Sequence, residues 1–214
     1  MNTAMLHAVT EDLASFLSEV TDGDLSLPTP CVEWTVGDLY RHVVEENGRF
    51  GHAVSGRPVP RHATAEHRNA NVFELARSPG IGYEEIYRAS ARYMESAFGE
   101  AEDARQPRQV EGVPGARPIS ELLEMQIADT LIHTWDLAKS IDLEYAPQPE
   151  IAERVLRLMQ MVPAVAYGEG KAFAAIRPDT DVVAAADADR LTTLDRLLLL
   201  SGRDITWLAG ARPR

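Results

Sequence analysis

The stretch at residues 119–141, ISELLEMQIADTLIHTWDLAKSI, constrains the fold more than any other part of the chain. Its apolar residues recur at helical spacing on two roughly opposite sides, which predicts one long, buried helix. Ser120 suits the N-cap, while Glu121 and Lys139 suit the positive and negative ends of the helix. The apolar positions are Leu123, Ile127, Leu131, Ala138 and Ile141 on one side and Met125, Ala128, Ile132 and Trp135 on the other.

A polar stripe runs between these two apolar sides. Asp129 and His133 are four residues apart, so their side chains lie one turn apart on the same face. A carboxylate and an imidazole in a core are costly unless other groups satisfy them. One interpretation is a neutral His133 that is hydrogen-bonded to Asp129. The other is half of a metal site, because helix bundles build such sites from inward side chains on facing helices.

Composition excludes several classes of protein. The 45% hydrophobic and 25% charged content is ordinary for a soluble globular protein, and the 214 residues suffice for one core with an appendage. No run of about 18 apolar residues exists, so we expect no membrane span. The N-terminus lacks a basic region and reads as a first helix, so we expect a cytoplasmic protein. The net charge of −12 argues against a nucleic-acid partner, which needs a basic face.

The single cysteine, Cys31, excludes an internal disulfide and a CxxC zinc site. A buried or merely tolerated thiol is a simpler interpretation of Cys31 than a catalytic nucleophile. Any thiol chemistry could therefore use an external thiol.

Helical spacing of apolar residues predicts further helices along the chain. They span residues 2–20, 36–54, 82–102 and 149–161, with a shorter one at 188–200. Thr35 is a good N-cap for the second helix, and Asp38 faces its free amides. The alternating residues at 108–111, with the turn that follows, predict a short strand or hairpin.

His42 lies on the second predicted helix, with Glu46 and Arg49 one and two turns further on nearly the same face. These three side chains could form the wall of a pocket. They could equally form a half-exposed helix face with ordinary pairing between turns. His52 lies off this face.

Three motifs resemble actinobacterial proteins related to mycothiol-dependent maleylpyruvate isomerase. The first, at residues 30–42, is Pro-Cys-x-x-Trp-Thr-Val-x-Asp-Leu-x-x-His. The second is HTWDLA at residues 133–138. The third combines DADRL at 187–191, LSGRD at 200–204 and Trp207, and it resembles the tail of one uncharacterised branch. Together the motifs cover nearly the whole chain.

The resemblance implies a mainly all-α fold, a DinB-like antiparallel four-helix bundle with a short C-terminal extension. The bundle and an added helix would take residues 1–165, and the extension, packed on the bundle, residues 166–214. The metal triad of the family falls on His42, Asp129 and His133. The family also makes a homodimer plausible.

Two histidines and a carboxylate are a normal set for catalytic zinc, which keeps a fourth position open. The same ligands suit nickel, iron or manganese. The family enzyme carries Glu where this chain has Asp129, whose carboxylate reaches one methylene less far.

The resemblance implies a metal-dependent isomerase or transferase that uses mycothiol as co-substrate on a small electrophile. Arg49 is the candidate for binding a substrate carboxylate. Glu46 and Gln126 are candidates for orienting the metal ligands. The alternatives are a non-catalytic ligand-binding bundle and a metal-free bundle. Outside this site, we expect Asp136 to support packing or cap a neighbour, and Trp34 and Trp135 to lie in the core.

Overall fold

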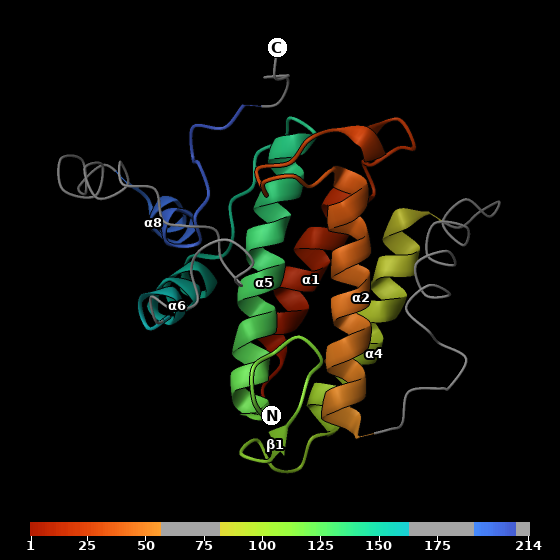
Figure 1. Ribbon diagram of the computed structural model, residues 1–214, viewed down its shortest axis with the longest axis vertical. Coiled ribbons are helices and arrows are strands. Elements are labelled where there is room, and N and C mark those ends of the chain that lie inside the picture. The colour runs from red at the N-terminus through yellow and green to blue at the C-terminus, as the bar shows by residue number, and fades with distance from the viewer. Residues whose placement is uncertain (57–81, 163–190, 209–214) are drawn as a thin grey trace.

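The computed structural model describes residues 1–56, 82–162 and 191–208, and these are mainly helical (Figure 1). Each long helix predicted from the sequence is present with slightly shifted ends, so the all-α fold class is confirmed. The helices are α1 (Ala4–Leu17), the 3-10 helix η1 (Asp24–Ser26), α2 (Val36–Ser55), α4 (Tyr83–Glu100), α5 (Ile119–Ser140), α6 (Pro149–Gln160) and α8 (Thr193–Leu200). The predicted hairpin is a small antiparallel sheet of β1 (Pro107–Arg108) and β2 (Arg117–Pro118).

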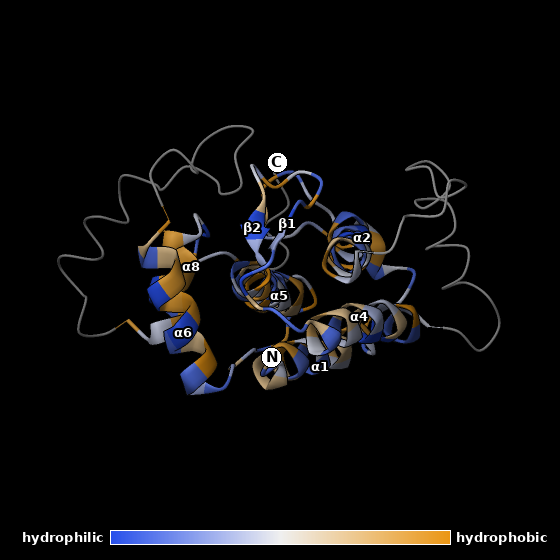
Figure 2. Ribbon diagram, turned by 90° about the horizontal axis from the view of Figure 1, so that it is seen from below, coloured by the Kyte–Doolittle hydropathy of each residue, from blue (hydrophilic) through white to orange (hydrophobic). Residues whose placement is uncertain are grey.

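Helices α1, α2, α4 and α5 form the bundle, and α6 and α8 stand together beside α5 (Figure 2). α2 and α4 run in the same direction, since Tyr40 packs on Tyr83 near their starts and His52 contacts Tyr93 further along. α1 and α5 run together in the opposite direction, so that Tyr145, just beyond α5, reaches the later part of α1. The antiparallel arrangement therefore relates one pair of helices to the other, while each pair is internally parallel.

The helix α5 is the central element, as its sequence predicts. Most of its side chains are buried, on all sides, and they contribute to both apolar clusters of the core. Trp135 is among them, which confirms its predicted place in the core. Because α5 is surrounded, its polar residues are held inside the molecule and must find partners there.

The starts of α2 and α5 use different solutions to the same problem of unpaired backbone amides. Thr35 caps the start of α2, as predicted, and Asp38 completes a reciprocal capping box with it. The prediction that Ser120 caps α5 is wrong, because that helix begins at Ile119 without a side-chain cap. The amides of Ile119 and Ser120 instead donate to the carbonyl oxygens of Gln106 and Ala104. The hairpin segment thus satisfies the start of α5.

The predicted boundary between bundle and extension, at residues 165 and 166, lies outside the described residues and stays a prediction. So does the part of the predicted helix 188–200 that precedes residue 191. Among the helices that the structure describes, none combines the length and apolar character needed to cross a membrane.

Candidate metal centre

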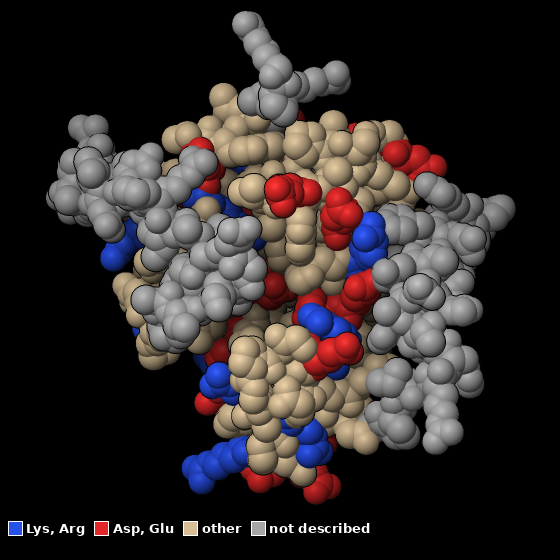
Figure 3. All heavy atoms as spheres, in the orientation of Figure 1, with Lys and Arg blue, Asp and Glu red and all other residues tan. Residues whose placement is uncertain are grey.

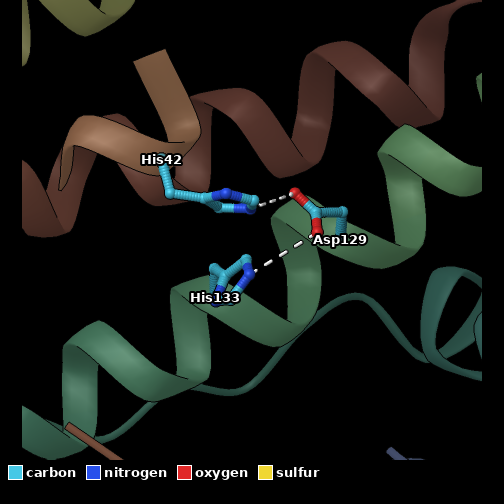
Figure 4. Close-up of side chains that lie close together, drawn as sticks. All are labelled: His42, Asp129 and His133. Carbon is cyan, nitrogen blue, oxygen red and sulfur yellow. Dashed lines mark ion pairs between the residues drawn. The ribbon is translucent and has the colours of Figure 1, made fainter. Parts of the chain in front are cut away.

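The facing sides of α2 and α5 bring His42, Asp129 and His133 together (Figure 4). Oδ2 of Asp129 lies 3.5 Å from Nε2 of His42, and Oδ1 lies 3.5 Å from Nε2 of His133. One ligand atom from each residue lies within 4.8 Å of the others. The structure thus assembles the predicted triad from two helices that are far apart in sequence.

The spacing suits a metal ion better than it suits direct hydrogen bonds. Distances of 3.5 Å are long for a charge-assisted hydrogen bond. Two ligand atoms bound to one tetrahedral zinc ion, each about 2.0–2.1 Å from it, lie about 3.3 Å apart. Nε2 of His42 is also buried without a hydrogen-bond partner among the described residues. Such an orphaned nitrogen is expected of a ligand that lacks its ion. The three residues therefore fit a divalent metal.

The electrostatics of the triad centre on Asp129. Burial alone raises the pKa of this carboxyl, but the adjacent His133 and His42 imidazoles outweigh burial and hold that pKa well below its usual range. Burial alone lowers the pKa of His133, but the carboxylates of Asp129 and Asp136 raise it to about 9. Asp129 is therefore ionised and ready to bind a cation. A metal would compete with the proton on His133.

Trp34 covers the two histidines. Its indole stacks on the His133 ring, with centroids 5.6 Å apart and planes 15° apart, and lies 4.8 Å from the His42 ring. The predicted core position of Trp34 is only partly correct, because it is half-buried in the loop before α2 and packs against the core from outside. Thr29 anchors this loop through hydrogen bonds to the Trp34 carbonyl oxygen. Trp34 thereby covers one side of the triad with an aromatic ring.

Asp136 contacts His133 on the side of the ring that faces away from Asp129. It is fully buried, and its Oδ2 lies 3.0 Å from Nδ1 of His133. Arg203, which follows α8, donates to both Asp136 oxygens. From the sequence, Asp136 is expected only to pack or to cap a neighbour, and Arg203 is not among the predicted site residues. The signal was present, because both residues lie in the motifs that carry the resemblance, at 133–138 and 200–204.

Glu46 and Arg49 extend the site along α2. Arg49 pairs with the buried Glu46, whose Oε1 lies 3.8 Å from Nδ1 of His42. Gly112, which has φ +84, makes room for the guanidinium, since a Cβ there would lie 2.9 Å from Nη1 of Arg49. Gln126 is buried on α5, but no hydrogen bond among the described residues joins it to the triad. Acidic and basic side chains surround a hollow over the middle of α2 and α5 (Figure 3).

Cys31 lies in the same loop as Trp34. Burial raises the pKa of its thiol to about 11, and the charge of Arg203 offsets this only in part. A thiol with so high a pKa is a poor nucleophile at neutral pH. This environment favours the interpretation of Cys31 as an unreactive thiol.

Comparison with known proteins points to one family. The family described as "Mycothiol maleylpyruvate isomerase N-terminal domain" matches residues 6–138. Two uncharacterised proteins of Mycobacterium tuberculosis, MT0763 of strain CDC 1551 and Rv0738 of strain H37Rv, are each 30% identical over 186 residues. These alignments cover 83% of this chain and 89% of the relative.

Among solved structures, the mycothiol-dependent maleylpyruvate isomerase superposes with a TM-score of 0.52 at 20% identity, over 73% of this chain. A histidine-to-alanine mutant of that enzyme gives a TM-score of 0.50 at 19% identity. The chain spans 65% of the length of the isomerase. At this identity the likeness establishes a common helical fold.

Proposed function

Because the chain belongs to the mycothiol maleylpyruvate isomerase N-terminal domain family, we propose that it is a metal-dependent enzyme that uses mycothiol on a small electrophile. The observation that carries this proposal is the arrangement of His42, Asp129 and His133 at the spacing of metal ligands. Zinc is the preferred ion for two imidazoles and one carboxylate, and nickel, iron and manganese are alternatives.

The residues of the site have separate tasks in this proposal. His42, Asp129 and His133 hold the ion and leave a position open. When bound there, a divalent ion supplies the positive charge that keeps a thiol sulfur ionised at neutral pH. Trp34 limits the access of water from the loop side. In this proposal the thiol first adds to the electrophile. If the adduct then rotates and expels the thiol, the product is an isomer of the substrate. If the thiol stays attached, the reaction is a transfer of the thiol to the electrophile.

Arg49 is the candidate for recognising a carboxylate on the electrophile or on the thiol. Its guanidinium can bind a carboxylate through two parallel hydrogen bonds. Glu46 forms an ion pair with this guanidinium. The Nε atom of Arg49 is buried and has no hydrogen-bond partner among the described residues. We propose that this nitrogen is a donor for the ligand. Glu46 would also orient His42, and Gln126 stays a candidate for orienting Asp129.

A metal-free bundle is the second candidate, and one observation favours it. The opposite charges of Asp129 and His133 already favour each other without an ion. A bundle stabilised by this pair would keep the fold without the chemistry.

Elemental analysis of protein purified without chelator or affinity tag separates the two candidates. We expect about one metal ion per chain in the wild type, by analogy with single-ion sites, and loss of the ion in His42→Ala and in His133→Ala. His52→Ala is the matched control, since His52 lies on α2 but hydrogen-bonds to Tyr93. Wild-type protein that takes up no metal after soaking with zinc would rule out the triad.

A thiol-dependent assay then tests the reaction. We expect mycothiol to accelerate conversion of maleylpyruvate or a related electrophile by the metal-loaded protein, and Arg49→Met to raise KM for substrates that carry a carboxylate. Metal binding without thiol-dependent turnover of any electrophile would favour a ligand-binding role.

A further inference from the structure

A chain of buried hydrogen bonds leads from His133 to the C-terminal segment. Nδ1 of His133 lies 3.0 Å from Oδ2 of Asp136, which is on the same helix. Arg203 donates to Oδ2 of Asp136 from Nη2 at 2.8 Å and to Oδ1 from Nε at 3.3 Å. Both Asp136 and Arg203 are buried. Arg203, which follows α8, is thus connected through the Asp136 carboxylate to Nδ1 of His133, a candidate metal ligand.

Arg203 is itself fixed by the turn that ends α8. Its Nη1 donates to the carbonyl oxygen of Ser201, and its amide donates to that of Leu198. Gly202, which lies between Ser201 and Arg203, has φ +81, a left-handed conformation that glycine adopts without strain. This turn directs the Arg203 side chain back toward α5 and leaves little freedom in the position of the guanidinium.

The contact determines which nitrogen of His133 faces the other two ligands. Asp136 accepts a hydrogen bond, so Nδ1 of His133 must carry the hydrogen, and Nε2 points toward Asp129. Groups that hold the second nitrogen of a ligating histidine fix its ring and raise its basicity. The buried Asp136 carboxylate needs a cation nearby to remain ionised, and Arg203 supplies it.

We propose that Arg203 is a positioning residue for the metal centre, acting through Asp136 to orient His133 and to set its affinity for metal. The proposal deepens the proposed function and, as regards metal, rests on it. The family match ends at residue 138, so Arg203 lies outside the matched domain. The C-terminal segment is then part of the site rather than a passive appendage.

Zinc affinity, measured by competition with a chelator, tests the proposal. We expect Arg203→Met to weaken zinc binding by about 10- to 100-fold and to alter the visible spectrum of the cobalt-substituted protein. Arg203→Lys, which keeps the charge but loses the paired hydrogen bonds, should fall between Arg203→Met and wild type. Arg154→Met is the matched control, because Arg154 makes a paired contact with Glu124 that joins α6 to α5 away from the site.

Folding must be controlled separately, because removing Arg203 alone leaves the buried carboxylate of Asp136 uncompensated. The double variant Asp136→Asn with Arg203→Met removes both charges, and circular dichroism checks its fold. We expect it to fold and to bind zinc at least about tenfold more weakly than wild type. A folded single or double variant with wild-type zinc affinity and an unchanged cobalt spectrum would overturn the proposal.

Nuclear magnetic resonance separates this proposal from the proposed function. The hydrogen on Nδ1 of His133 should give a protected, downfield resonance in wild type, with or without zinc, that Arg203→Met loses to exchange with water. If wild type binds no metal, the proposed function fails, and this resonance still decides the role of Arg203. An equally protected resonance in Arg203→Met would contradict it.

Discussion

The indole of Trp34 lies nearly parallel to the imidazole of His133, with 15° between their planes and 5.6 Å between their centroids. Trp34 comes from the loop before α2 and His133 from the middle of α5, so the stack joins two segments that are distant in sequence. The Trp34 indole also lies near His42, with 4.8 Å between the two ring centroids. Trp34 is therefore a built-in optical probe of the candidate metal centre.

Binding of a paramagnetic ion should quench the fluorescence of Trp34. Titration of the metal-free protein with Co²⁺ is expected to lower tryptophan emission, and Trp34→Phe should remove most of this quenching. Trp207→Phe is the control, because it deletes another tryptophan that, among the described ring contacts, does not pack on His42 or His133 as Trp34 does. Equal quenching in wild type and Trp34→Phe would place the ion elsewhere.

The sequence predicts part of this candidate site because one helix carries two of the three proposed ligands. The positions of Asp129 and His133 follow from helical periodicity, since residues four apart share a face. The partnership with His42 does not follow from periodicity, because it depends on how α2 and α5 pack. The grouping of His42 with Asp129 and His133 is predicted only by the resemblance of the motifs to the family.

The remaining contacts escape prediction for the same reason. Trp34, which packs on His133, and Arg203, which binds Asp136, come from irregular segments, where no repeating pattern indicates which way a side chain points. The start of α5 is a similar case, because carbonyl oxygens of the hairpin segment replace the expected Ser120 cap. Backbone partners of that kind leave no trace in the residue types.

Zinc affinity should rise with pH. In the metal-free protein the pKa of His133 is raised to about 9, so the ring carries an extra proton at neutral pH that zinc must displace. Displacement of one proton makes the apparent affinity increase about tenfold per pH unit from about pH 6 to about pH 8. Calorimetry in buffers with different ionisation enthalpies should show about one proton released per zinc ion. An affinity that is flat over this range would contradict the assignment.

Without metal, the stability of the protein should fall at high pH. The pKa of His133 rises from 6.5 to about 9 on folding. Its ion pairs with Asp129 and Asp136 therefore stabilise the fold fully below about pH 6.5 and are lost as pH rises through about 9. The shift corresponds to a contribution on the order of 3 kcal/mol.

Urea unfolding in the presence of a chelator measures this contribution. The free energy of unfolding should fall between about pH 6 and about pH 10 more steeply in wild type than in His133→Gln, which lacks the titrating ring. Comparison with the variant cancels groups that titrate in both proteins. Parallel pH profiles would show that the His133 ion pairs contribute nothing.

Cys31 should react slowly with alkylating agents. Burial raises the pKa of its thiol from 9.0 to about 11, so the thiolate fraction at neutral pH is about a hundredfold lower than for an ordinary cysteine. We expect iodoacetamide to modify the folded protein about a hundredfold more slowly than the urea-unfolded protein. Cys31→Ser should retain metal binding and thiol-dependent activity. Loss of that activity would identify Cys31 as the nucleophile and remove the need for an external thiol.

Glu33, which precedes Trp34, has a left-handed backbone with φ 68 although it is not glycine. This conformation costs an ordinary residue about 1 kcal/mol more than it costs glycine. Glu33→Gly should therefore be more stable than Glu33→Ala by about 1 kcal/mol in urea unfolding. The neighbouring Val32 has no positive φ, so Val32→Gly should be less stable than Val32→Ala by about 0.5–1 kcal/mol. The same sign at both positions would mean that the turn which presents Trp34 to the histidines is not held in this conformation.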